Sequence, residues 1–249
     1  MLVDTHCHIH ESYDLPVDEV LRDAHEQGVT QMICVGTSET SSKQAIEFAA
    51  KHEEAFAAIG VHPHDTKDGY AEITTLADTS EKIVAVGEIG LDYFYTHSPR
   101  ETQIAGLKEQ IEVALKHNLP IIFHVREAFD DFWPIFDSYE GIRGVLHSFT
   151  DSQENMEKAI AKGLYIGVNG ISTFTKDDAQ KAMFDAIPLD KILFETDAPF
   201  LTPAPYRGKI NQPAYVRIVA EYHATRRGLS LEEIAKASTQ NARALFQLK

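Results

Sequence analysis

The sequence predicts an α/β protein with the fold of a TIM, or (β/α)8, barrel. Three observations support this fold class. The 249 residues are close to the ~250 that are typical of one such barrel. Short apolar runs alternate with segments of helical period along the whole chain. Six side chains of the kind that bind metals, from His6 to Asp197, close five of these runs, and they meet only if the strand ends meet at one rim.

The apolar runs predict eight strands, and a helical segment follows each. We expect strands at residues 2–8, 31–36, 55–62, 83–90, 120–125, 144–149, 164–169 and 191–197. We expect helices at residues 17–27, 40–51, 69–79, 99–118, 128–139, 152–162, 176–186, 212–227 and 230–246. This order is typical of right-handed parallel connections. A doubly wound open sheet is the alternative, but it gives no reason for ligands at the ends of five different strands.

Stop signals agree with these boundaries. Gly28 follows the first helix, Asn118 ends the fourth, Gly163 ends the sixth and Pro188 closes the seventh. The aromatic residues within 129–136 recur at helical spacing, so we expect them to pack against the barrel. No linker or low-complexity segment interrupts the pattern, and we expect a single domain over residues 1–249.

Composition narrows the class of protein. A net charge of −15 opposes non-specific attraction to nucleic acid and to anionic membranes. Cys7 and Cys34 have no paired spacing, and no apolar run approaches the ~18 residues of a membrane span. We therefore expect a cytoplasmic protein with reduced thiols, without a membrane partner and without an evident obligate protein partner.

Strand parity places the candidate ligands on one face. Because side chains alternate across a strand, residues i and i+2 point the same way, as His6 and His8 do. The same alternation continues the inward apolar face of four later strands, and it ends there at Glu88, His124, His147 and Asp197. A buried carboxylate without a partner is costly, and a metal ion supplies the partner. A salt bridge at the rim is the alternative for both carboxylates.

Two divalent ions are the economical assignment for this set. Mixed histidine and carboxylate ligands suit zinc, manganese or iron, and magnesium where oxygens dominate. Such a pair generates hydroxide near neutral pH, and we expect Glu88 and Asp197 to be catalytic, with Asp197 orienting the water and accepting its proton. Glu88 can bridge the ions, since a carboxylate has two oxygens. One ion would be held by His6, His8, Glu88 and Asp197, and the other by His124 and His147.

Further residues around this set suit a phosphate. His62 ends the third strand on the inward face, where it would donate to a substrate phosphate or a leaving group; a structural histidine is the alternative. Arg126 shares the face of His124, and Arg207 lies in the loop after the eighth strand. Both are candidates for bidentate phosphate contacts, against ordinary ion pairing at the rim. Asp4 is expected to hydrogen-bond a histidine ligand.

Six motifs occur in order: DTHCH, GVHPH, GEIGLDY, FHVREA, HSF and ETDAPFLTP-x-PYRGK-x-N. They resemble the TatD family of metal-dependent deoxyribonucleases, which belongs to the amidohydrolase-like superfamily. The likeness spans residues 3–213, and the tail STQNARALF also fits. It departs at Asp151, where members commonly carry glycine, and at Gln212, where they commonly carry glutamate. The resemblance implies a TIM barrel, a divalent-metal centre on the same six ligands, and removal of nucleotides from single-stranded 3′ ends of DNA.

Three functions follow as hypotheses. The first is a deoxyribonuclease that cleaves DNA phosphodiester bonds, as a 3′-5′ exonuclease on single strands, with two divalent ions (Mg, Mn or Zn). Its partner is a DNA 3′ end or another phosphodiester. The second is a hydrolase of the same superfamily that acts on a small ester, lactone or amide, since fold does not fix function. The third is a non-enzymatic metal-binding scaffold.

Overall fold

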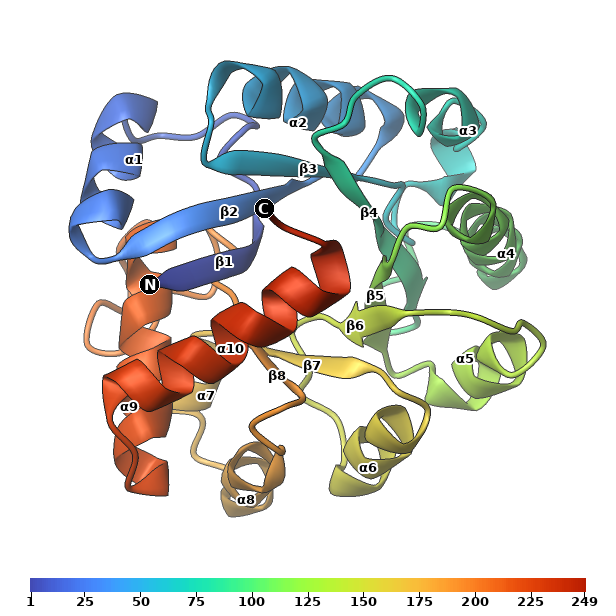
Figure 1. Cartoon of the computed structure of the whole chain (residues 1–249). Coiled ribbons are helices and arrows are strands. Elements are labelled where there is room, and N and C mark those ends of the chain that lie inside the picture. The colour runs from blue at the N-terminus through green and yellow to red at the C-terminus, as the bar shows by residue number, and fades with distance from the viewer. The chain divides into compact units, whose positions relative to one another are not determined.

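A computed structural model describes residues 1–249 and confirms the predicted fold class. Eight strands form one sheet in the order β1 to β8, which is the strand order of a TIM barrel, and the pairs that can be followed are parallel. Figure 1 shows the strands and helices coloured in chain order. The strands are β1 Leu2–Cys7, β2 Val29–Val35, β3 Ala55–Ile59, β4 Ile83–Asp92, β5 Ile121–Arg126, β6 Gly144–Leu146, β7 Tyr165–Val168 and β8 Ile192–Phe194.

The helices follow the predicted order with boundaries shifted by a few residues. They are α1 Val17–Glu26, α2 Glu39–Lys51, α3 Ile73–Leu76, α4 Arg100–Lys116, α5 Phe129–Phe136, α6 Gln153–Ala161, α7 Ile171–Phe174, α8 Asp178–Ala186, α9 Val216–Arg227 and α10 Leu231–Phe246. Two short 3-10 turns, η1 Thr66–Asp68 and η2 Pro213–Tyr215, complete the list. The stop signals are borne out, since Gly28, Gly163 and Asn118 all have positive φ angles.

One predicted helix is much shorter than expected. Residues 69–79 contain only the four-residue α3, and a 3-10 turn precedes it. Gly69 has a φ of 114°, which ends the preceding turn. The helix stops at Leu76, whose carbonyl accepts both the backbone N–H of Thr79 at 2.9 Å and the Thr79 hydroxyl at 2.7 Å. The short helix α7 is the opposite case, because the sequence pattern did not predict it.

Several strands end earlier than predicted because side chains take over their backbone hydrogen bonds. Beyond β3, the Gln110 amide accepts from the Val61 N–H at 2.7 Å and donates to the Val61 carbonyl at 3.2 Å. Beyond β8, the Thr196 N–H donates to the Asp4 carboxylate at 2.9 Å. The candidate site residues His62 and Asp197 therefore follow strand ends that buried polar groups hold in place.

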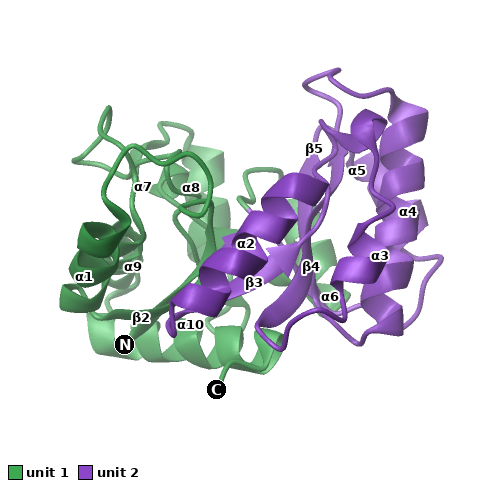
Figure 2. Cartoon of the chain, turned by 90° about the horizontal axis from the view of Figure 1, so that it is seen from above, with its two compact units in different colours: residues 1–33, 148–249 green, residues 34–147 purple.

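The chain divides into two compact units, residues 1–33 with 148–249 and residues 34–147 (Figure 2). In the first unit, β1 and β8 lie side by side, and a parallel bridge joins Cys7 to Ala198 just beyond them. The first and last strands of the sheet therefore meet inside this unit, where α10 packs on both. The single domain over residues 1–249 stays a prediction.

The second unit has an aromatic core under α5, as the helical spacing predicted. Phe123 of β5 lies with its ring 5.1 Å from that of Phe132 and 6.1 Å from that of Phe136. Phe132 is fully buried, and burial of such a side chain contributes roughly 2–3 kcal/mol. This packing fixes β5, the strand that carries His124 and ends at Arg126. No helix in the structure is both long and apolar enough to cross a bilayer.

Candidate metal centre

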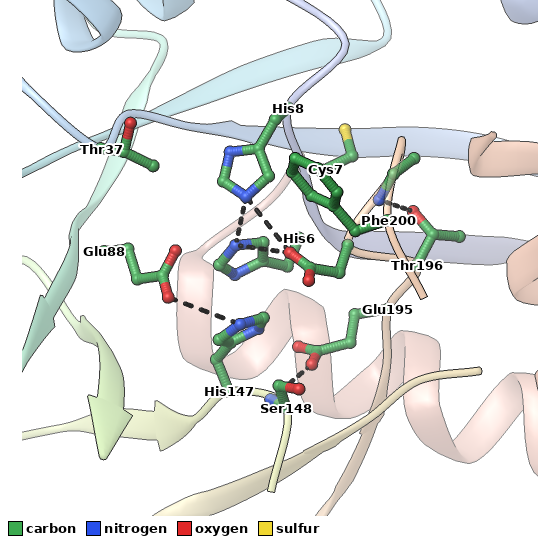
Figure 3. A network of polar contacts seen from close by, with 12 residues as sticks. His6, Cys7, His8, Thr37, Glu88, His147, Ser148, Glu195, Thr196 and Phe200 are labelled. Atoms are coloured by element: carbon green, nitrogen blue, oxygen red, sulfur yellow. Dashed lines mark hydrogen bonds and ion pairs between the residues drawn. The ribbon is translucent and has the colours of Figure 1, made fainter. Parts of the chain in front are cut away.

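The first unit brings together His6, His8 and Asp197. The Nε2 atoms of His6 and His8 lie 3.1 Å apart, and Asp197 Oδ1 lies 3.6 Å from the former and 3.2 Å from the latter. Figure 3 shows the two imidazoles turned toward each other. Both histidines are buried, so three ligand atoms face one point away from bulk water. Two imidazoles and one carboxylate oxygen are a common ligand set for zinc and related ions.

Backbone contacts hold this group in place. The Asp197 N–H donates to the His6 carbonyl at 2.8 Å, and Asp197 itself has a φ of 60°, which turns the chain at the end of β8. Asp4 lies fully buried and accepts hydrogen bonds from the Thr196 hydroxyl at 2.6 Å and from the His6 N–H at 3.3 Å. Asp4 thus holds the backbone of His6 and the residue before Asp197, and it does not hydrogen-bond an imidazole, contrary to the sequence expectation. Burial raises its pKa to about 8, although the hydrogen bonds from Thr196 oppose the rise.

The second unit gathers three histidines around Glu88. Its Oε1 lies 2.8 Å from His124 Nδ1 and 3.5 Å from His147 Nε2. The dashed line from Glu88 in Figure 3 marks the contact with His147. His62 Nε2 also lies 3.5 Å from this oxygen. Glu88 is 4% exposed, so one buried carboxylate faces three imidazoles. The structure therefore brings the predicted ligands of this unit into contact.

Two glycines allow the strands to approach closely enough for this arrangement. A Cβ atom at Gly90 would lie 1.8 Å from the His124 carbonyl oxygen, and the φ of Gly90 is 156°. A Cβ atom at Gly60 would lie 2.7 Å from the backbone of Gly87. The glycines of the GEIG and AIGVH segments therefore let β4 lie tightly between its neighbours, which places Glu88 beside His124 and His62.

Asp92 is a site residue that the sequence reasoning missed. Its Oδ2 lies 3.0 Å from His124 Nε2 and 2.9 Å from His64 Nε2. The side-chain amide of Gln103 accepts a hydrogen bond from the Asp92 backbone N–H and donates one to the Asp92 carbonyl. When His124 Nε2 donates to Asp92, its Nδ1 is directed at Glu88 and at any cation bound there. The available signal was parity, since Asp92 follows Glu88 by four residues on the same strand face.

The electrostatics of this unit favour positive charge at His124. Burial lowers the pKa of His124, but hydrogen bonds to Asp92 and Glu88 outweigh that effect and raise it above the ordinary value. Asp92 shows the converse: burial raises its pKa, but the hydrogen bonds from His124 and from the Tyr95 backbone lower it below the usual range. Two carboxyl side chains around one imidazole are an environment that a bound cation fits.

The hydrogen bonds of His62 define which of its two ring nitrogens carries the proton. The backbone N–H of His64 donates to His62 Nδ1 at 3.1 Å, so the ring proton lies on Nε2, the nitrogen that faces Glu88. Burial lowers the pKa of His62 well below its ordinary value, which keeps the ring neutral near pH 7. A protonated Nε2 is a donor and not a metal ligand. His64, in the loop after β3, lies against Asp92.

The two candidate phosphate-binding arginines lie on exposed positions. Arg126 at the end of β5 places its guanidinium 4.0 Å from the ring centroid of Phe94. Arg207 donates to the Thr202 carbonyl at 2.8 Å and lies 3.8 Å from the ring centroid of Phe174. Neither guanidinium takes part in a salt bridge, so both retain donors for an anion.

Comparisons with known proteins agree on one family. The family model described as "TatD related DNase" matches residues 3–247. An uncharacterized metal-dependent hydrolase of Bacillus subtilis is 39% identical, with 100% of each chain covered. A protein of Erwinia amylovora named 3'-5' ssDNA/RNA exonuclease TatD is 34% identical, with 93% of each chain covered. The crystal structure of a TatD homologue from Escherichia coli K12 has a TM-score of 0.91 at 28% identity, with 100% of this chain and 98% of that chain covered.

Proposed function

The chain belongs to the family of TatD-related DNases, whose curated members here are metal-dependent hydrolases, and from that premise we propose that it hydrolyses phosphodiester bonds in DNA. The proposed reaction is stepwise removal of nucleotides from single-stranded 3′ ends. The name of the Erwinia relative supports this specificity. The structural observation that carries the proposal is Glu88, a buried carboxylate that faces His124, His147 and the donor His62.

The residues present fit divalent ions. In the first unit, two imidazole nitrogens and a carboxylate oxygen converge on one point. In the second unit, Glu88 and His124 face each other beside His147, with Asp92 fixing the ring of His124. We propose that each group holds one ion; bridging by Glu88 stays a prediction of the sequence. When bound, such ions supply a nucleophile from water near neutral pH and offset the charge that develops on the phosphate.

The remaining roles belong to side chains of this chain. His62 donates a hydrogen bond from its Nε2–H to a phosphate oxygen or to the leaving group and keeps the proton, because its Nδ1 is occupied by the His64 N–H. Arg126 and Arg207 contact phosphate oxygens with guanidinium donors that no carboxylate of the chain occupies. Asp197 orients the attacking water and accepts its proton.

A second candidate is a hydrolase of a small ester, lactone or amide. The net charge of −15 favours it, because it opposes a strong general attraction to a polyanion. The Bacillus relative is also described only as a metal-dependent hydrolase, without a substrate. In this case the same ligand groups would act on a neutral or singly charged substrate.

A substrate panel separates the candidates, including a non-enzymatic scaffold. Metal-stripped protein is supplied with Mg²⁺, Mn²⁺ or Zn²⁺ and given bis(p-nitrophenyl) phosphate, aryl esters, lactones and an anilide. We expect metal-dependent hydrolysis of the phosphodiester above that of the other substrates, and its loss in Glu88→Gln. Faster lactone or ester hydrolysis would favour the second candidate. Tight metal binding without any turnover would favour the scaffold.

A further inference from the structure

The exposed aromatic side chains of this chain are concentrated in two loops. Among the large hydrophobic residues, only Met1 and four aromatic residues are exposed. The aromatic residues follow β4 and β8, the strands that lead to Glu88 and Asp197, at the end of the strands where barrel enzymes bind their substrates. The four are Phe94 at 49%, Tyr95 at 43%, Phe200 at 59% and Tyr206 at 37% exposure. Grouped exposed aromatic rings are a surface on which a ligand can bind.

Phe94, Tyr95 and Arg126 form one group in the second unit, which we call the aromatic platform. The rings of Phe94 and Tyr95 lie 4.7 Å apart at an interplanar angle of 86°. The guanidinium carbon of Arg126 lies 4.0 Å from the first ring centroid and 5.0 Å from the second. The ring of His97 stacks on that of Tyr95 at 5.6 Å and 21°, and Arg126 is itself exposed, so the platform combines exposed aromatic rings with a positive charge at the surface.

The platform is fixed to the candidate metal centre by Asp92. One oxygen of this carboxylate accepts the backbone N–H groups of Phe94 and Tyr95, each at 3.0 Å, and the other oxygen contacts His124 and His64. The ring of Tyr95 also lies 5.5 Å from the ring of His64. A group bound on the platform is therefore held next to the imidazole that faces Glu88.

We propose that the aromatic platform stacks an unpaired nucleobase of the nucleotide whose phosphate is hydrolysed. The inference rests on the proposed function and adds to it the structural basis for choosing single strands. Bases expose their faces only when they are unpaired, and they stack on aromatic rings and on guanidinium planes without regard to sequence. Arg126 matches the ligand in charge, since a phosphate adjoins every base. The platform thus selects frayed or single-stranded ends and tolerates any base.

Equilibrium binding tests the platform independently of turnover. The full-length protein is titrated, in buffer with Ca²⁺, into a 5′-fluorescein ten-nucleotide single strand, and anisotropy is followed. A second strand of the same length carries abasic tetrahydrofuran units at its three 3′-terminal positions. Wild type is compared with the double variant Phe94→Ala with Tyr95→Ala. Phe56→Ala is the matched control, because Lys82 lies 5.0 Å over that ring, in the same unit but outside the loop.

We expect the double variant to bind the natural strand roughly tenfold more weakly than wild type does, as loss of base stacking predicts. Wild type and double variant should bind the abasic strand equally, and Phe56→Ala should match wild type on both strands. Equal affinity of wild type and double variant for the natural strand would overturn the inference. So would an equal loss on both strands, or no binding of either strand by wild type. Hydrolysis of bis(p-nitrophenyl) phosphate by the same preparations reports separately on the proposed function.

Discussion

Single side chains set the chemistry of the candidate centre through the atoms they leave available. His62 illustrates this, because a backbone N–H occupies its Nδ1 and forces the proton onto Nε2. His124 is oriented in a comparable way, with Asp92 on one nitrogen and Glu88 on the other. The distinction between ligand and donor among these histidines therefore depends on hydrogen bonds that residue type alone does not reveal.

Asp92 offers the most direct test at this scale. In Asp92→Asn the amide no longer favours a proton on His124 Nε2, so the ring loses its fixed orientation toward Glu88. We expect divalent-metal affinity or hydrolytic activity to fall by roughly 10- to 100-fold. Isothermal titration of metal-stripped protein measures the first quantity. Asp78→Asn, on an exposed carboxylate, is the control, and an unchanged affinity and activity in Asp92→Asn would remove this role.

Strand parity predicted that the candidate ligands share one face because alternation is a strong constraint on any strand with one inward face. Glu88 and His124 were predicted for this reason, and the structure brings them within 2.8 Å. Asp92 was missed because it lies past Gly90, where the apolar pattern had already ended. The proton position on His62 was beyond prediction, since it depends on a loop backbone that no side-chain pattern encodes.

At the scale of elements, the close packing of β4 is the feature that positions the second unit's ligands. In Gly90→Ala the added Cβ meets the backbone oxygen of His124, which cannot move without shifting β5. We expect a loss of about 3 kcal/mol in the free energy of unfolding from this overpacking. Gly28→Ala is the matched control, because its φ is also positive at 77° but nothing lies within 4 Å, and about 1 kcal/mol is expected. Equal losses in urea denaturation would contradict the account.

The contact of α9 with β8 predicts a pH-dependent stability. His223 is buried against Phe194, and burial lowers its pKa from 6.5 to about 3, with Arg227 adding to the effect. The unfolded chain therefore binds one more proton than the folded protein between these pH values. The stabilising contribution of the neutral ring is complete above pH 6.5 and is lost as pH falls toward 3.

Denaturant titrations from pH 4 to pH 6 measure this effect. Relative to wild type, His223→Phe should show a shallower fall in the free energy of unfolding on acidification, by about 1.4 kcal/mol per pH unit. Comparing slopes cancels any constant loss from the substitution. Parallel curves for the two proteins would show that His223 is protonated equally in the folded and unfolded states.

The sequence predicted which strands and helices exist more accurately than it predicted the residues at which they end. The eight strands and most helices follow from apolar periodicity, which reports burial over many residues. The early ends of β3 and β8 depend on Gln110 and Asp4, which are distant in sequence and replace ladder hydrogen bonds. The short α3 ends where the hydroxyl of Thr79 donates to the Leu76 carbonyl, and periodicity does not detect such a local hydrogen bond.

At the scale of the whole molecule, the charge of −15 constrains how a nucleic acid can bind. That charge opposes a general attraction to a polyanion, so we expect the proposed binding of DNA to depend on bound cations and on a few side chains such as Arg126 and Arg207. Specificity then follows from local contacts at the end of a strand, and not from a long electrostatic track. This agrees with an enzyme that acts on ends and with the aromatic platform beside Glu88.

The most direct test of the central claim is digestion of a 5′-labelled single strand by metal-stripped protein with Mg²⁺, Mn²⁺ or Zn²⁺ restored, beside Glu88→Gln. The account predicts a ladder that shortens stepwise from the 3′ end with at least one metal. It predicts no ladder without metal and none in the variant, which should retain the circular dichroism spectrum of the wild type. An intact strand with every metal, in protein that binds divalent ions, would contradict the nuclease assignment.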